Sequence, residues 1–107
     1  MQHWKTGFIY IITNAHHNVL YVGVTSDLLQ RIEQHRSKYY PKSFSARYNV
    51  FKLVYYEAFP ESIIQAIERE KQLKAGYRRK KEMLINDFNP DWVDLYDELI
   101  SGRKVLF

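Results

Sequence analysis

Three short runs of β-branched and aromatic residues predict the strands of a small sheet. Residues 8–13 (FIYIIT) and 19–24 (VLYVGV) flank the turn-like segment 14–18, and this arrangement predicts a β-hairpin. Residues 51–57 return to the same strand character. Three strands are too few for a sandwich, so we expect a small sheet covered by helices, in the α/β (α+β) class.

Apolar positions at helical spacing predict a first helix directly after the hairpin. Residues 25–27 (TSD) offer three candidate N-cap residues, and Leu28, Leu29 and Ile32 then recur at helical spacing to about Lys38. The polar, basic and aromatic segment 39–49 shows no periodicity. We expect this segment to be a surface loop. Its polar members include Lys42, Ser43, Ser45 and Arg47.

Three further helices are predicted in the second half of the chain. One spans about residues 60–76, with a proline in its first turn and a glycine just past its end. A basic helix follows at about 77–87. The last begins at Pro90, with Asn89 as its N-cap residue. The apolar face of this last helix comprises Trp92, Leu95, Tyr96 and Leu99.

One carboxylate lies on the apolar side of helix 60–76. With about 100° per residue, Ile63, Ala66 and Ile67 share a face, and Glu70 falls within it whereas Glu68 does not. An inward-facing carboxylate is costly unless an arginine or a cation pairs with it. A buried salt bridge and a metal ligand are both open explanations. A single such carboxylate argues against a two-metal site but suits one Mg²⁺, which also binds substrate phosphate.

Composition narrows the class of protein. A chain of 107 residues with 46% apolar and 26% charged residues predicts one folded domain, residues 1–107. The absence of cysteine excludes disulfides, thiolate zinc sites and cysteine nucleophiles, so any metal must be held by oxygen or imidazole. No signal peptide and no apolar run of ~20 residues are visible, and we therefore expect a cytoplasmic protein.

Charge is segregated along the chain, whose formal net charge is +4. Residues 71–81 hold six basic side chains and no acid, whereas residues 87–98 hold five acids and no base. The basic run is compatible with a phosphate-binding face, and equally with a solvated helix face. Further basic residues of the first helix and the loop would extend such a face: Arg31, Arg36, Lys38, Lys42 and Arg47.

Tyrosine is abundant, with nine copies, and two of them lie on the predicted hairpin. Whether Tyr10 and Tyr21 share a sheet face depends on a register that the sequence does not reveal, so a core aromatic pair and a functional pair are both open. Arg31 and His35 are one helical turn apart and lie together. Gly23 stands near a strand-to-helix corner, where the backbone turns sharply or approaches another group closely.

Together these residues resemble the GIY-YIG nuclease superfamily. The resembling elements are residues 8–10 (FIY) and 21–23 (YVG), Arg31, His35, residues 66–71 (AIEREK) and residues 89–90 (NP). The resemblance covers about residues 7–95 and implies a three-stranded antiparallel sheet flanked by helices. It is closest to the stand-alone bacterial subfamily related to the N-terminal domain of the excision-repair nuclease subunit. Phe8 stands where the first signature has glycine.

The resemblance implies a role for each of five candidate catalytic residues. Tyr21 would deprotonate or position the attacking water, and Tyr10 would support it by hydrogen bonding. Arg31 would stabilise charge on the scissile phosphate, Glu70 would bind the divalent metal, and His35 would assist proton transfer or contact the phosphate. Gly23 and Asn89 would help to shape the pocket.

The resemblance also implies Mg²⁺ or Mn²⁺ as cofactor and DNA, including branched or damaged DNA, as substrate in repair. Basic residues expected to contact the nucleic acid are Lys42, Arg47, Lys71, Lys74, Arg78 and Arg79. Family nucleases commonly carry an additional targeting domain, and a partner protein would take that role here. Two alternatives stay open: a non-catalytic nucleic-acid-binding module using the basic helix 71–81, and a partner-binding domain whose acidic last helix is the interface.

Overall fold

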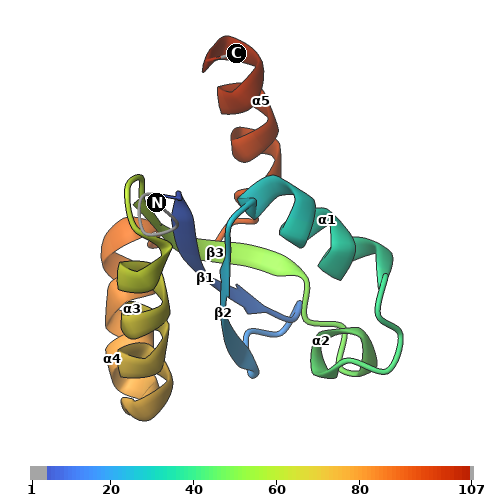
Figure 1. The fold of residues 1–107 in the computed structure, drawn as a ribbon. Coiled ribbons are helices and arrows are strands. Elements are labelled where there is room, and N and C mark those ends of the chain that lie inside the picture. The colour runs from blue at the N-terminus through green and yellow to red at the C-terminus, as the bar shows by residue number, and fades with distance from the viewer. Residues whose placement is uncertain (1–4, 107) are drawn as a thin grey trace.

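The computed structural model describes residues 5–106, and in this range three strands form one sheet with five helices around it. In chain order the elements are β1 (Gly7–Thr13), β2 (Leu20–Thr25), α1 (Leu28–Ser37), α2 (Phe44–Arg47), β3 (Lys52–Phe59), α3 (Ile63–Ala75), α4 (Arg78–Phe88) and α5 (Tyr96–Leu106). The strands are antiparallel and lie in the order β2-β1-β3 (Figure 1). This architecture confirms the predicted fold class.

Each face of the sheet has its own apolar core. Successive strand residues point to opposite faces, and β1, at the centre of the sheet, is buried on both. Ile9 and Ile11 pack on the side covered by α3 and α4, whereas Tyr10 and Ile12 pack on the side covered by α1 and α5 (Figure 1). The sheet therefore separates two clusters of buried side chains.

A β-bulge in β3 decides which of its residues face which core. Ile11 lies opposite Tyr55, but Ile12 lies opposite Leu53, so one residue of β3 is skipped. Val54 and Tyr55 both join the α3/α4 core as a result, and Leu53 joins the α1 core.

The first helix is confirmed, but the expected loop at 39–49 is wrong in part. Asp27 caps α1 by accepting a hydrogen bond from the Gln30 amide at 3.1 Å. The segment after it contains the single-turn helix α2, capped by Ser43. A helix of four residues is too short to produce a periodic pattern, which is why the sequence conceals it.

The later helices begin and end at different residues than predicted. Helix α3 begins after its N-cap Ser62, so Pro60 lies in the preceding turn rather than in the helix. Asn89 is not the N-cap of a helix at Pro90, because it ends α4 and its amide group donates to the carbonyls of Val54 and Val93. The last helix begins only at Tyr96.

A glycine at the start of β1 lets α3 approach the sheet closely. A Cβ atom on Gly7 would lie 2.7 Å from the Ile63 Cα atom, which is closer than van der Waals contact allows. Phe8, which replaces the glycine of the first signature, packs instead at the edge of the α1 core. The close helix–strand contact therefore needs a glycine at position 7.

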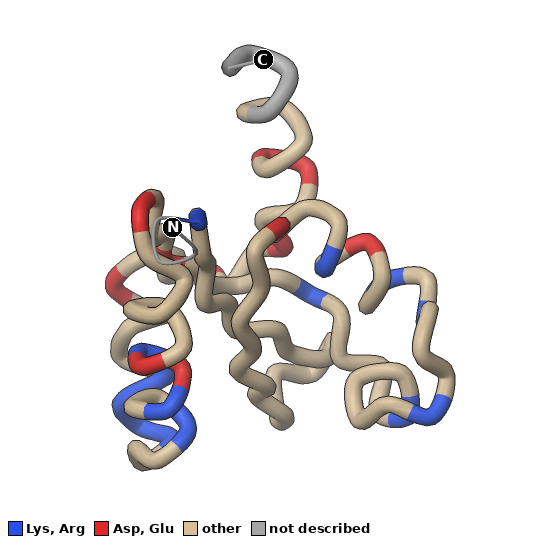
Figure 2. Tube along the Cα trace, in the orientation of Figure 1, with Lys and Arg blue, Asp and Glu red and all other residues tan. Residues whose placement is uncertain are grey.

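Basic and acidic residues are concentrated in different parts of the molecule. Figure 2 shows blue segments at the adjoining ends of α3 and α4 and around the α1–α2 connection, whereas red segments mark the first turn of α5. No helix in the described part of the chain is both long and apolar enough to span a bilayer.

Candidate active site

The sheet register places both hairpin tyrosines on the face that α1 covers. Tyr10 lies opposite Gly23, and Ile12 lies opposite Tyr21. Since residues opposite one another share a face, and Tyr10 and Ile12 share one by alternation, Tyr21 lies on the same face as Tyr10. The pair is diagonal across the two strands and is not a directly opposed aromatic pair.

Gly23 makes room for the ring of Tyr10. A Cβ atom at Gly23 would lie 2.3 Å from both the Cζ atom and the hydroxyl oxygen of Tyr10. The backbone of Gly23 has an ordinary negative φ, so the requirement for glycine here comes from the close approach of Tyr10.

A chain of hydrogen bonds connects Tyr10 to α1 and α2. Arg31 Nε donates to the Tyr10 hydroxyl at 3.3 Å, and the same hydroxyl lies 2.9 Å from His35 Nε2. His35 Nδ1 lies 2.7 Å from the Ser45 hydroxyl, which lies 3.3 Å from that of Ser43. Elements far apart in sequence are joined here in one buried network.

The direction of these bonds follows from their donors and acceptors. Arginine only donates, so the Tyr10 oxygen accepts from Arg31. The buried Tyr10 proton also needs an acceptor, and His35 Nε2 at 2.9 Å is the partner that supplies one, which assigns this bond as Tyr10 to His35. The imidazole then carries its proton on Nδ1 and donates it to Ser45. Every buried side-chain nitrogen and oxygen in the described residues has a partner.

Burial and the arginine charge set the protonation states of this network. Burial raises the pKa of Tyr10 to about 12, although the hydrogen bond and charge of Arg31 act in the opposite direction. Burial, with the nearby Arg31 charge, lowers the pKa of His35 to about 4. At neutral pH Tyr10 is therefore protonated, His35 is neutral, and Arg31 carries the positive charge.

Tyr21 is the more accessible tyrosine of the pair. It lies on the edge strand β2, half-buried, with its ring centroid 5.9 Å from that of His35 and stacked on Phe44 at 6.1 Å. A small pocket of about 40 Å³ opens beside it. The pocket is lined by Tyr21, Arg31, Gln34, His35, Tyr40, Ser43, Phe44 and Ser45.

Helix α3 brings an ammonium group close to Tyr21, together with the carboxylate that pairs with it. The Lys74 Nζ atom lies 5.7 Å from the centre of the Tyr21 ring and 3.2 Å from the Glu70 carboxylate. The negative charge of Glu70 also acts on Tyr10 and contributes to raising its pKa, after the larger effect of burial. Glu70 therefore lies close enough to the tyrosine site to influence it.

The helical pattern correctly distinguishes the two glutamates of α3. The Glu70 side chain is 16% exposed, whereas Glu68 belongs to the exposed residues of the helix. Glu70 pairs with Lys74, while the neighbouring Arg69 forms a two-point ion pair with Glu57 on β3. Neither Arg69 nor Arg31 neutralises Glu70.

The donor set suits one hard cation held by few protein ligands. In residues 5–102, whose side chains the structure describes, no three histidines, aspartates or glutamates cluster as a metal-binding group. Glu70 supplies a single partly exposed carboxylate. Mg²⁺ binds in this manner, because it retains several waters and takes one or two carboxylates together with substrate phosphates.

The basic residues predicted to contact nucleic acid lie on both flanks of this site (Figure 2). Lys42 and Arg47 belong to the α1–α2 side and are exposed, as are Lys71 and Arg79 on the α3/α4 side. Arg78 is engaged within the molecule: its guanidinium donates to the carbonyls of residues 17 and 18 and contacts Glu82. Lys74 is paired with Glu70, as described above.

Asn89 lies outside the lining of the pocket at Tyr21. Its side chain ties the end of α4 to β3. Ser45 was not predicted as a partner of His35, because the two side chains meet only when α2 folds against α1. A hydroxyl in a polar segment carries no signal for this contact.

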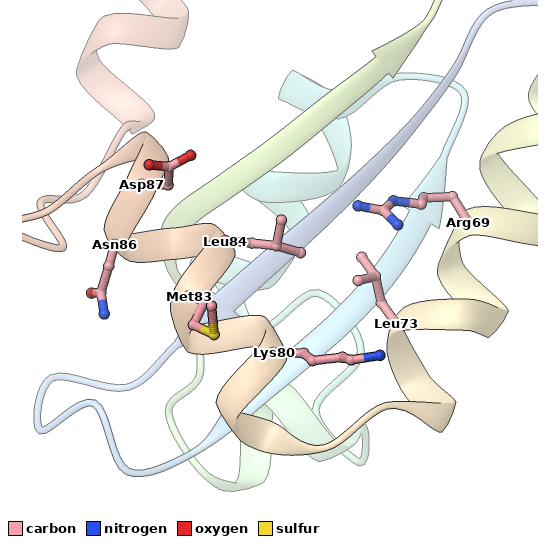
Figure 3. Close-up of a pocket in the computed structure, with 7 residues that line it drawn as sticks. All are labelled: Arg69, Leu73, Lys80, Met83, Leu84, Asn86 and Asp87. Carbon is pink, nitrogen blue, oxygen red and sulfur yellow. The ribbon is translucent and has the colours of Figure 1, made fainter.

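A larger pocket lies between α3 and α4 (Figure 3). It measures about 680 Å³, and its lining residues are Arg69, Leu73, Lys80, Met83, Leu84, Asn86 and Asp87. None of the five candidate catalytic residues lines it. Its size exceeds that of the pocket at Tyr21, but the convergent polar groups are at Tyr21.

Comparisons with known proteins complete the description of the site. Residues 6–83 match the model of the GIY-YIG catalytic domain. The solution NMR structure of a UPF0213 protein from Bacillus halodurans is 32% identical, with coverage of 76% of this chain and 83% of that one and a TM-score of 0.46. A search of curated proteins found no match.

Proposed function

The chain belongs to the GIY-YIG family, and we propose that it is a divalent-metal-dependent endonuclease that hydrolyses phosphodiester bonds in DNA. The family places the chain in a nuclease superfamily and implies DNA as the substrate. The predicted membership in this family is confirmed. The metal, the tyrosine mechanism and the role of each residue are the content of the proposal.

The observation that carries the proposal is the position of Arg31. Its guanidinium is half-buried, held by Tyr10 and Gln34, and forms no ion pair with any described carboxylate. A partly buried positive charge without a carboxylate partner attracts an anion, and Arg31 lines the pocket beside Tyr21. A scissile phosphate bound there would lie between Arg31 and Tyr21.

Tyr21 is assigned to the attacking water. Arg31 lines the same pocket as Tyr21, and the Lys74 ammonium group lies 5.7 Å from the centre of the Tyr21 ring, so positive charge surrounds the site. Tyr21 would position the water through its hydroxyl group or, as phenolate, take one proton from the water and become the phenol. Water then attacks phosphorus in line, the bond to the leaving oxygen breaks, and Arg31 offsets the negative charge that builds up on the phosphate. A divalent cation bound at Glu70 would stabilise the leaving oxygen.

Tyr10 and His35 act as positioning residues in this proposal. Tyr10 is fully buried, and both ring nitrogens of His35 already have partners within the protein. Their network fixes the orientation of Arg31 on α1 relative to Tyr21 on β2. Such rigid support keeps the charged group in place before the substrate arrives.

The test is metal-dependent nicking of plasmid and branched DNA with Mg²⁺ or Mn²⁺. We expect Glu70→Gln and Tyr21→Phe to reduce the initial rate by about 10²- to 10⁴-fold, the usual range for losing an acid–base or charge-stabilising group. Glu68→Gln and Tyr77→Phe change an exposed glutamate and an exposed tyrosine elsewhere, and both should retain the wild-type rate. Equal rates in all five proteins would contradict the proposal.

The same experiment addresses the binding-module alternative. Within the basic run at 71–81, Lys74, Arg78 and Lys81 already bond to groups of the protein itself. A module that only binds would show salt-sensitive DNA binding and no metal-dependent product. Glu70→Gln would then leave its behaviour unchanged.

A further inference from the structure

We propose that the segment joining α1 to β3 is a binding site for unpaired bases, so that the DNA substrate has a single-stranded stretch beside the bond that is cut. The site consists of four exposed aromatic side chains, which we call the aromatic platform: Tyr39, Tyr40, Phe44 and Tyr48. This inference rests on the proposed function for its location and goes beyond it in naming the substrate.

The exposure of the platform is unusual within the molecule. The four side chains are 63%, 51%, 47% and 50% exposed in chain order. Four of the ten exposed large apolar side chains found in the described residues thus fall within residues 39–48. The other six are spread over α3, α4 and the segment after them. A concentration of exposed aromatic surface marks an interaction site rather than random exposure.

The platform is continuous with the candidate active site. Phe44 stacks on Tyr21 with an angle of 22° between the rings, and the Tyr48 ring lies 4.8 Å from Phe44. The Arg31 guanidinium lies 5.6 Å from the centre of the Tyr40 ring. A nucleotide next to a phosphate held at Arg31 would therefore meet these rings directly.

Positive charge accompanies the aromatic rings. Lys42 and Arg47 are exposed on the same segment, and the Arg47 guanidinium lies 5.9 Å from the centre of the Tyr48 ring. Aromatic faces interleaved with cationic groups form the combination that holds single-stranded nucleic acids, through base stacking and backbone phosphates respectively.

The flat faces of the rings select unpaired nucleotides. Within a duplex, each base face is covered by its neighbours, and only base edges and phosphates are presented outward. The exposed rings gain little from a continuous duplex, whereas a free base can stack on them. A basic surface alone would bind both forms through their phosphates.

The experiment measures binding without cleavage. Fluorescence anisotropy is recorded in EDTA with a labelled single-stranded DNA oligonucleotide and with the blunt duplex of the same sequence. Tyr39→Ala and Tyr48→Ala are chosen because both side chains are exposed and neither lines the pocket at Tyr21. Tyr77→Ala is the matched control, because Tyr77 is 83% exposed but lies at the start of α4.

We expect wild-type protein to bind the single strand more tightly than the duplex. Each platform substitution should weaken single-strand binding by about 5- to 100-fold, the range found for losing one base–aromatic stack, with little effect on the duplex. Tyr48→Phe should retain wild-type binding because it keeps the ring, and so should Tyr77→Ala. Equal binding of both DNA forms, or equal losses on both, would overturn the inference.

Failure of this inference is distinguishable from failure of the proposed function. Selective single-strand binding without metal-dependent cleavage would retain the platform and contradict the nuclease. If wild-type protein cleaves DNA with metal, but Tyr39→Ala and Tyr48→Ala bind single strand and duplex as tightly as wild type does, the nuclease proposal stands and the platform is contradicted.

Discussion

The two faces of the sheet carry similar clusters of tyrosine and arginine that differ in charge. The arginine of one cluster is paired with a carboxylate, and the arginine of the other is not. On one face Tyr10 bonds to Arg31, and on the other Tyr55 and Arg69 both bond to Glu57. Burial raises the pKa of each tyrosine to about 12, and for Tyr55 the Glu57 carboxylate contributes to the rise. The decisive difference is the carboxylate, which neutralises Arg69 but has no counterpart at Arg31.

This difference explains why one cluster suits structure and the other suits chemistry. A two-point arginine–carboxylate pair satisfies both charges and ties β3 to α3. Arg31 is fixed by neutral partners, so its charge stays available to a phosphate. The same residue types therefore serve different ends, depending on whether the protein supplies the anion itself.

Among the comparisons between the two faces, the largest expected effect separates the two arginines. Arg31→Met should reduce the initial rate of DNA cleavage by about 10²- to 10³-fold, because it removes the positive charge that we propose for the scissile phosphate. Arg69→Met should leave the rate near wild type and lower the thermal midpoint, because it leaves Glu57 without its partner. A similar loss of cleavage in both variants would remove the functional distinction between the faces.

A second prediction uses the pH dependence of stability. The folded-state pKa of His35, about 4, lies below the unfolded value of about 6.5, so its contribution is complete above pH 6.5 and is lost as the pH falls toward 4. We expect up to about 3 kcal/mol of unfolding free energy to disappear over this window. Urea titrations at several pH values should show that His35→Gln removes most of the slope.

The control for this measurement is His16→Gln, which changes an exposed histidine of the β1–β2 loop. Glu57, on the other face, acts at lower pH. Burial alone would raise the pKa of Glu57, but the hydrogen bonds from Arg69 and Tyr55 hold that pKa below the usual 4.5. The contribution of Glu57 to stability is therefore lost only below pH 4.5. A slope between pH 6.5 and 4 that persists in His35→Gln would contradict the assignment.

The third prediction compares two glycines that make close contacts on opposite faces. Gly23→Ala forces a methyl group against Tyr10, and Gly7→Ala forces one against α3, so each should cost about 1–3 kcal/mol of stability. Only Gly23→Ala should also reduce the specific activity of the folded fraction. Gly102→Ala meets nothing within 4 Å on α5 and should stabilise by up to about 1 kcal/mol.

Thermal unfolding followed by circular dichroism gives the stability of these three variants, and nicking assays below each midpoint give the activity. Unchanged activity in folded Gly23→Ala would show that the position of Tyr10 does not matter to the reaction.

The smallest expected effect concerns the end of the hydrogen-bonded chain. Ser45→Ala leaves the Nδ1 proton of His35 without an acceptor, which should cost about 1–2 kcal/mol of stability and slow cleavage by about tenfold. Ser45→Thr keeps the hydroxyl and should restore both properties. Tyr55→Phe, on the other face, removes a hydroxyl from Glu57 and should not affect cleavage. Slower cleavage in Tyr55→Phe as well would show that the cluster on the other face also affects the reaction.

Much of this architecture could be predicted from sequence because it depends on local patterns. Alternating and β-branched residues predicted the strands. Three candidate N-cap residues predicted the start of α1, and one of them, Asp27, is the N-cap. Helical spacing predicted that Glu70 rather than Glu68 faces inward. These features depend on residues within one or two helical turns, where periodicity determines which side chain faces the sheet.

The remainder depends on contacts between residues distant in sequence. The register that places Tyr10 opposite Gly23, and the bulge in β3, arise from pairing between whole strands rather than from a local pattern. Asn89 precedes a proline as an N-cap residue would, but its side chain bonds to β3, 35 residues away. The contact of Ser45 with His35 likewise exists only after α2 folds against α1.

Strand β1 is hydrogen-bonded to a neighbour on each side, and Tyr10 lies in its middle. Its amide protons should therefore exchange with solvent only when the whole domain unfolds, whereas those of residues 39–43, which lie mostly exposed beside α1, should exchange through local openings. The strand that carries Tyr10, the hydrogen-bond partner of Arg31, then opens only when the whole domain unfolds. Residues 39–43, where we propose that a base binds, can open and close many times while the rest of the molecule stays folded.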